Sequence, residues 1–148
     1  MLSSILSFLF DEKEYGKSFL LTIIRFIIGM IFIQTGLGKL THLGDTTAFF
    51  GQLGIPYPHL NALMASFTEL VGGTALILGV LTRLTVIPLI GVMIVAILTA
   101  QLPEVHSWSD LIRLQEVDYI LFFTVLGVFG AGKWSVDAFL RRWGSAKT

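Results

Sequence analysis

Long apolar runs constrain this chain more than any other feature of its sequence. A helix that crosses a bilayer needs roughly 20 mostly apolar residues. Strands of a membrane β-barrel would appear instead as alternating segments of about 10 residues. Four continuous apolar segments meet or approach the helical requirement, at about residues 18–37, 58–80, 84–102 and 117–132. The sequence therefore predicts an all-α integral membrane bundle of four helices, with residues 1–148 forming a single transmembrane domain.

The composition supports a protein that faces lipid. Hydrophobic residues make up 54% of the chain and charged residues 14%, whereas a typical soluble domain is about 25% charged. The mean hydropathy is +0.81. A soluble protein of this size could not bury so much apolar surface, so the bilayer is the expected partner. The net charge of zero gives no electrostatic footprint for nucleic acid.

Short amphipathic helices are expected at both ends. Residues 1–10 lack the basic region and cleavage site of a secretory signal peptide, and they predict an interfacial helix that is retained. Near the C-terminus, Ser135 can cap a second short helix with Asp137 in its first turn. That helix would place Phe139 and Trp143 on an apolar face and Arg141 beside lipid headgroups.

The distribution of basic residues predicts the orientation. Four spans place both termini on one side of the membrane, together with the tight turn at 81–83. Lys39 and Arg113 fall on the opposite side, and seven basic residues fall on the side of the termini: Lys13, Lys17, Arg83, Lys133, Arg141, Arg142 and Lys147. The positive-inside rule then places both termini in the cytoplasm.

Three charged residues lie inside the apolar runs: Arg25, Glu69 and Asp118. Charges at membrane depth are costly, so they usually face the bundle interior in pairs. Arg25 and Glu69 have similar depths when counted from the ends of their spans, and the moderate loop between those spans allows them to be neighbours. We therefore expect an Arg25–Glu69 ion pair near the middle of the bilayer.

A second polar layer is expected nearer the outer face. Lys39 could pair there with Glu116 or Asp118 at the start of the fourth span. Glu116 and Tyr119 are three residues apart, so they share a helix face. On the first span a stripe at helical spacing joins the two layers: Arg25, Gly29, Phe32, Gly36 and Lys39. Together these residues predict a polar cleft that opens outward and narrows toward Arg25 and Glu69.

Two interpretations of this polar interior stay open. The charges can simply orient the helices, or they can surround an amphipathic ligand such as a quinone. Such a ligand would bond Arg25, Gln34 or Glu69 and lay its ring against Phe32 or Phe67. The chain has no cysteine, so any redox chemistry must belong to a bound cofactor or a partner subunit. The three histidines lie near or outside the outer boundary, and no metal site is expected.

In order and spacing, several motifs resemble the DoxX family of small four-helix membrane proteins, over about residues 18–139. The matching pieces are Arg25-x3-Gly29-x6-Gly36-x2-Lys39, Gly54-Ile55-Pro56, Glu69 with Gly72-Gly73, Gly79-x2-Thr82-Arg83, Glu116, and Gly130-Ala131-Gly132-Lys133-Trp134-Ser135-Val136-Asp137. The resemblance extends to the DoxD-type subunit of thiosulfate:quinone oxidoreductase. It implies a role linked to quinones in a bacterial or archaeal cytoplasmic (inner) membrane.

Three functions compete at this point. The first is a quinone-linked oxidoreductase or its membrane subunit, in which Arg25 stabilises negative charge, Glu69 or Glu116 relays protons and a thiosulfate-like anion approaches Lys39. The ligand contacts would then be Gln34, Lys39, Glu116, Asp118, Tyr119 and Phe32. The second is a scaffold or a carrier of a small anion or lipid, which would need a homo-oligomer. The third is a structural anchor for a soluble redox subunit.

Overall fold

In the part that the structure describes, the chain consists of helices joined by short turns and loops. The computed structural model describes residues 14–103 and 105–143 in full and gives helix bounds from 2 to 145. The main helices are α1 (Leu2–Thr41), α3 (Pro58–Leu78), α4 (Thr82–Ala96) with its π-helical extension η1 (Ile97–Gln101), and α6 (Gln115–Phe129). Shorter elements connect or follow them: α2 (Leu43–Gln52), η2 (Leu102–Glu104), α5 (Trp108–Ile112) and α7 (Val136–Ser145).

The predicted all-α membrane fold is confirmed, but the count of four spanning helices is not exact. Within the described residues, three helical segments are long and apolar enough to cross a membrane: Glu14–Thr41, Pro58–Leu78 and Thr82–Gln101. The fourth, α6, has 15 residues, which is short for a complete crossing. It nevertheless completes the bundle, because α4 packs along it.

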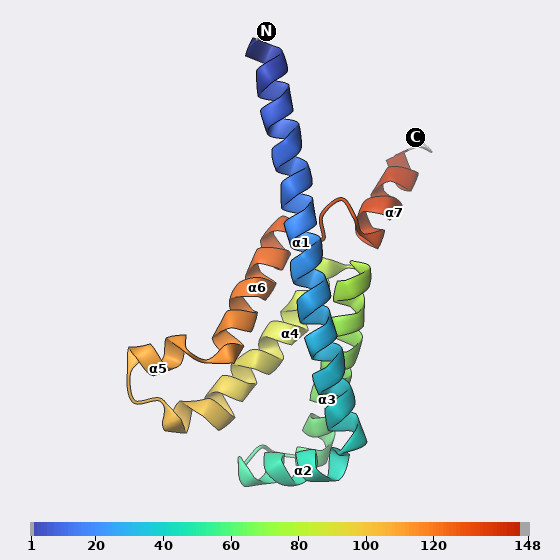
Figure 1. The fold of residues 1–148 in the computed structure, drawn as a ribbon. Coiled ribbons are helices and arrows are strands. Elements are labelled where there is room, and N and C mark those ends of the chain that lie inside the picture. The colour runs from blue at the N-terminus through green and yellow to red at the C-terminus, as the bar shows by residue number, and fades with distance from the viewer. Residues whose placement is uncertain (1, 146–148) are drawn as a thin grey trace.

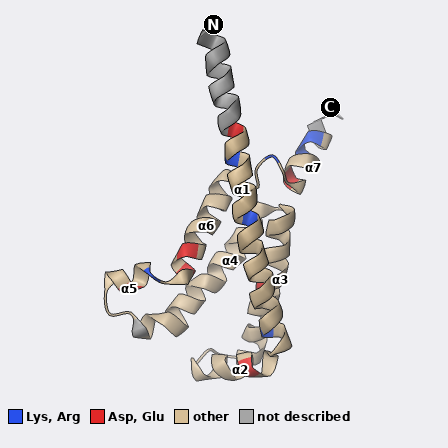
Figure 2. Cartoon of the chain, in the orientation of Figure 1, with Lys and Arg blue, Asp and Glu red and all other residues tan. Residues whose placement is uncertain are grey.

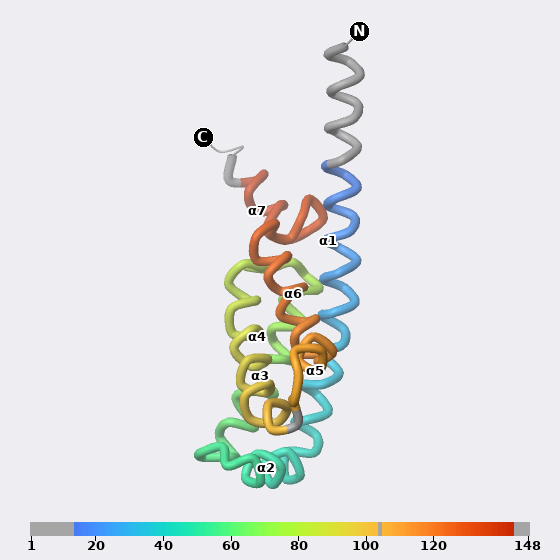
Figure 3. The backbone as a smooth tube through the Cα atoms, turned by 90° about the vertical axis from the view of Figure 1, so that its left-hand side faces the viewer, coloured from blue at the N-terminus to red at the C-terminus, as the bar shows by residue number. Residues whose placement is uncertain are grey.

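The bundle consists of two helix pairs. α1 packs along α3, α4 packs along α6, and the α3–α4 contact joins the pairs (Figure 1). α2 lies across one end of the bundle, against α3 and α1, while both chain ends lie toward the opposite end (Figure 3). The first described turns of α1 and helix α7 therefore share one end of the bundle.

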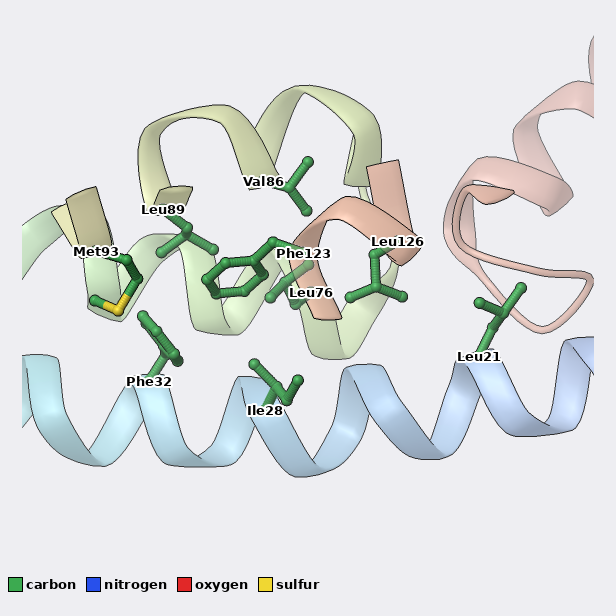
Figure 4. Close-up of a cluster of buried hydrophobic side chains, with 9 residues drawn as sticks. All are labelled: Leu21, Ile28, Phe32, Leu76, Val86, Leu89, Met93, Phe123 and Leu126. Atoms are coloured by element: carbon green, nitrogen blue, oxygen red, sulfur yellow. The ribbon is translucent and has the colours of Figure 1, made fainter. Parts of the chain in front are cut away.

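The apolar core lies between the two helix pairs. Its nine buried side chains come from all four main helices (Figure 4): Leu21, Ile28, Phe32, Leu76, Val86, Leu89, Met93, Phe123 and Leu126. Phe32 packs edge-to-face on Phe123 with ring centroids 5.1 Å apart. The stripe predicted on the first span faces this interior, since Arg25, Gly29, Phe32 and Gly36 are all buried.

Glycines set the distance between α1 and α3. A Cβ added at Gly36 would lie 2.6 Å from the backbone nitrogen of Leu70, and one at Gly73 would lie 2.7 Å from the carbonyl oxygen of Gly29. Such contacts are impossible without moving a backbone, so the glycines hold the two helices in close contact.

The segment after α6 folds back onto the α3–α4 turn. The Ser135 hydroxyl accepts a hydrogen bond from the Ala138 N–H at 3.1 Å, so the predicted cap of α7 is confirmed. The Asp137 carboxylate accepts from the N–H groups of Leu81 and Thr82, at 2.8 and 3.1 Å. It thereby caps α4 from another helix. The helix predicted at residues 1–10 lies outside the described residues.

Candidate ligand cavity

A cavity of about 870 Å³ opens within the bundle. This bundle cavity has the size of a small-molecule site, which is typically 300–1,000 Å³. Its lining is mainly apolar and comes from α1, α2, α3, α4, η1 and α6. The lining residues include Phe32, Thr35, Lys39, Asp45, Thr46, Phe49, Phe50, Asn61, Met64, Thr68, Glu69, Met93, Thr99, Gln101, Gln115, Glu116 and Tyr119.

An ion pair between α1 and α3 lies on the cavity wall. The Lys39 ammonium donates to Glu69 Oε1 at 2.5 Å. The Glu69 side chain is only 1% exposed, and its second oxygen, Oε2, has no hydrogen-bond partner within the described part of the chain. A buried carboxylate oxygen normally has a partner. This one leaves an acceptor available for the hydroxyl or amide of a ligand.

The predicted Arg25–Glu69 ion pair is wrong. The Arg25 guanidinium is buried and donates instead to three backbone carbonyls, those of Ala131 at 2.5 Å, Trp134 at 3.0 Å and Ile77 at 3.5 Å. The residues that accept these hydrogen bonds lie in the C-terminal segment and at the end of α3. Arg25 does not line the bundle cavity.

The helix register explains this error. Gly36 lies level with Ser66 and Leu70, and Gly29 lies level with Gly73 and Ile77. Glu69 is therefore about ten residues, or roughly 15 Å, from the level of Arg25 along α1. Lys39 is only about four residues from the level of Glu69 along α1.

The direction of the side chains also favours Lys39, rather than Arg25, as the partner of Glu69. In a helix every Cα–Cβ bond tilts toward the N-terminus. Because α1 and α3 are antiparallel, Lys39 and Glu69 tilt toward one another. Arg25 tilts in the same direction as Lys39, but from its position this leads away from Glu69 and toward the end of the bundle where the C-terminal segment lies.

A second polar pair lies on the α4–α6 side of the cavity. Gln101 Nε2 donates to Glu116 Oε1 at 3.0 Å, so the predicted pairing of Lys39 with Glu116 or Asp118 is also wrong. The π-helical turn η1 carries Gln101, and π-turns often mark functional positions. Tyr119 packs edge-to-face on Phe32, with ring centroids 5.1 Å apart.

The structure brings together five of the eight predicted site residues: Phe32, Lys39, Glu69, Glu116 and Tyr119. Gln34 and Asp118 are exposed and do not line the cavity. Phe67, considered as a ring contact, is 51% exposed on the outside of α3. The cleft reaches Glu69 as predicted but does not continue to Arg25.

Sequence reasoning missed the contribution of α2. Its segment was expected to be a loop, yet it places Asp45, Thr46, Phe49 and Phe50 on the cavity. The segment contains few strong helix formers, so its residues gave no clear signal for a helix. Among the described residues, no group of three or more metal-ligating side chains could hold a metal ion.

The fold and the cavity define a class: a small helical membrane protein with an amphipathic cavity between its helices. Residues 20–102 match the DoxX family, and the chain belongs to that family.

Similar proteins are known in three bacteria. The chain is 30% identical to the Bacillus subtilis protein named "Putative oxidoreductase CatD", over 80% of this chain and 84% of that protein. It is 28% identical to "Uncharacterized membrane protein Rv3486" of Mycobacterium tuberculosis, over 77% of both. It is 25% identical to "Inner membrane protein YqjF" of Escherichia coli, over 80% of this chain and 89% of that protein. No solved structure matches the chain.

Proposed function

We propose that the protein is the membrane subunit of a quinone-linked oxidoreductase and that its bundle cavity binds the quinone. The observation that carries this proposal is the Lys39–Glu69 pair, whose carboxylate is buried with one oxygen unpartnered on the wall of a largely apolar cavity. The name of the B. subtilis relative and the resemblance to the DoxD-type subunit support the same class of activity.

The cavity fits the shape and polarity of a quinone. A quinone has a flat ring, two carbonyl acceptors and an apolar body, so it needs aromatic walls and a few hydrogen-bond donors. Phe32, Phe49 and Tyr119 supply rings on the lining. The Lys39 ammonium supplies a charged donor, and the amide of Gln101 supplies a neutral one on the α4–α6 side.

The ion pair suits the chemistry of quinone reduction, which takes up two electrons and two protons. Lys39 would donate a hydrogen bond to a carbonyl oxygen and stabilise the negative charge that develops there. The Glu69 carboxylate, paired with Lys39 through Oε1, would accept at Oε2 a hydrogen bond from a hydroxyl of the reduced quinone and relay one of the two protons, while the second would be taken up from water. Because the chain has no cysteine, a thiol relay within it is excluded, and we assign electron supply to a redox partner subunit. Arg25 is assigned a structural role.

The proposal is tested by titrating the purified protein, in nanodiscs, with a short-chain ubiquinone analogue. Lys39→Ala should weaken binding about tenfold or more, since it removes the donor to the quinone carbonyl. Glu69→Gln should also weaken binding, because it breaks the ion pair that holds the Lys39 ammonium on the cavity wall. The matched controls are Lys133→Ala and Glu14→Gln, because Lys133 and Glu14 form an ion pair at 3.9 Å outside the cavity.

Unchanged affinity in both cavity variants would contradict the proposal. So would an absence of binding by the wild-type protein, or a bound phospholipid that the quinone cannot displace. That last result would favour a lipid carrier or a non-catalytic scaffold.

A further inference from the structure

A second, smaller cavity lies at the other end of the bundle, beside the chain termini. This basic recess has a volume of about 290 Å³ and is formed by α1, the end of α6, the following loop and α7. Among the residues that the structure describes, four cations line it, Lys17, Lys133, Arg141 and Arg142, against one carboxylate, Glu14. Figure 2 shows basic stretches of α1, the loop and α7 gathered at this end.

The lysines of the recess are held over aromatic rings. The Lys17 ammonium lies 4.7 Å from the ring centroid of Phe129, and the Lys133 ammonium lies 4.3 Å from that of Tyr15. These cation–π contacts fix the ammonium groups without neutralising them. Glu14 lies 3.9 Å from Lys133, which is too long for a strong hydrogen bond. The described lining of the recess therefore carries an excess of positive charge.

The recess also lies where membrane helices end. On α1, Glu14 and Lys17 directly precede the apolar run at 18–37, and α6 ends at Phe129. Two exposed tryptophans, Trp134 and Trp143, flank the recess in sequence, as expected at the level of lipid headgroups. α7 exposes Phe139 and Leu140 beside its arginines, a pattern typical of a helix that lies in the interface.

We infer that the basic recess binds the phosphate of an anionic phospholipid. The phosphate lies among the ammonium and guanidinium groups, and the acyl chains run along the exposed ring of Phe129. Basic pockets between helices at the membrane surface bind such headgroups. The recess is separate from the bundle cavity, so this inference does not depend on quinone binding.

The test is native mass spectrometry of the full chain in detergent, with added phosphatidylglycerol, phosphatidylcholine or inorganic phosphate. The wild-type protein should retain one phosphatidylglycerol in preference to phosphatidylcholine. The double variant Lys17→Gln/Arg142→Gln should lose this preference and bind phosphatidylglycerol about tenfold or more weakly, because each basic group near the surface favours an anionic lipid. Arg113→Gln, at an exposed position outside the recess, is the matched control and should bind as the wild type does.

Equal retention of the two lipids by the wild-type protein would overturn the inference. Equal phosphatidylglycerol binding by the wild type and the double variant would do the same. Inorganic phosphate that displaces the lipid at equal concentration would identify free phosphate as the ligand. A thermal melting curve for each variant distinguishes lost binding from lost folding, and a single variant, Lys17→Gln, replaces the double one if the latter does not fold.

Discussion

At the scale of single residues, two buried charges have different tasks. Glu69 faces the bundle cavity with Lys39, whereas Arg25 joins the segment after α6 to α1 and α3 through the carbonyls of Ala131, Trp134 and Ile77. Gly79 leaves room for this guanidinium, because a Cβ there would collide with Arg25 Nη1. Arg25 therefore holds the C-terminal segment against α1 and α3.

Replacing Arg25 should loosen that segment. Arg25→Met leaves buried carbonyls without donors, and we expect a loss of about 3 kcal/mol of unfolding free energy together with faster proteolysis at 130–135. Thermal unfolding in detergent and limited proteolysis measure both effects. Arg83→Met is the control, since exposed Arg83 donates to one carbonyl, that of Val128, at 3.2 Å, and should cost less than about 1 kcal/mol. Equal melting temperatures for the two variants would contradict this role.

The sequence could predict that Arg25 and Glu69 face the bundle interior, but it could not predict how the charged residues pair. Hydropathy gives the approximate depth of Arg25 and Glu69 within their spans, and the depths looked compatible. The register of α1 on α3 depends on which residues Gly29, Gly36 and Gly73 pack against. A single sequence does not reveal these contacts. The tilt of Cβ atoms in antiparallel helices favours Lys39 over Arg25 as the partner of Glu69 only once this register is known.

At the scale of elements, the α1–α3 contact determines the shape of the cavity wall. Gly36 lies next to Ser66 and Leu70, within one turn of both Lys39 and Glu69. A larger residue there would separate the two helices and lengthen the ion pair. The helices themselves were predictable from apolar length, whereas α2 was not, because its sequence LGDTTAFFGQ contains few strong helix formers.

A valine at Gly36 tests this contact. Gly36→Val should lower the unfolding free energy by about 1–3 kcal/mol through overpacking and weaken quinone binding as well. Gly38→Val places the same side chain in the same helix where nothing lies within 4 Å of the added Cβ, so it should change neither property. Thermal unfolding and the quinone titration read out both variants. A Gly36→Val protein as stable as Gly38→Val would contradict the packing argument.

At the scale of the whole molecule, both termini and the basic recess share one end, and α2 with the bundle cavity lies toward the other (Figure 1). The excess of basic residues at the terminal end predicts that this end faces the cytoplasm. The all-α membrane fold was predictable because apolar length is a property of the sequence, whereas the orientation stays a prediction. The cavity was predictable only in part, because its far wall comes from α2 and η1.

The lack of cysteine makes the orientation directly measurable. A cysteine introduced as Arg142→Cys should resist a membrane-impermeant maleimide in intact cells, and one introduced as Ser109→Cys in the opposite loop should react. Lysed cells should label at both positions, which controls for accessibility. The reverse pattern in intact cells would invert the orientation.

The measurement that tests the central claim most directly is photolabelling with an azido-quinone, followed by mass spectrometric location of the adducts. Quinone binding in the bundle cavity predicts adducts on lining residues such as Phe49, Phe50 and Met64, suppressed by unlabelled quinone and reduced in Glu69→Gln. Adducts confined to exposed positions outside the cavity, such as Leu84 and Ile87 on α4, or labelling that unlabelled quinone does not suppress, would show that the cavity is not a quinone site.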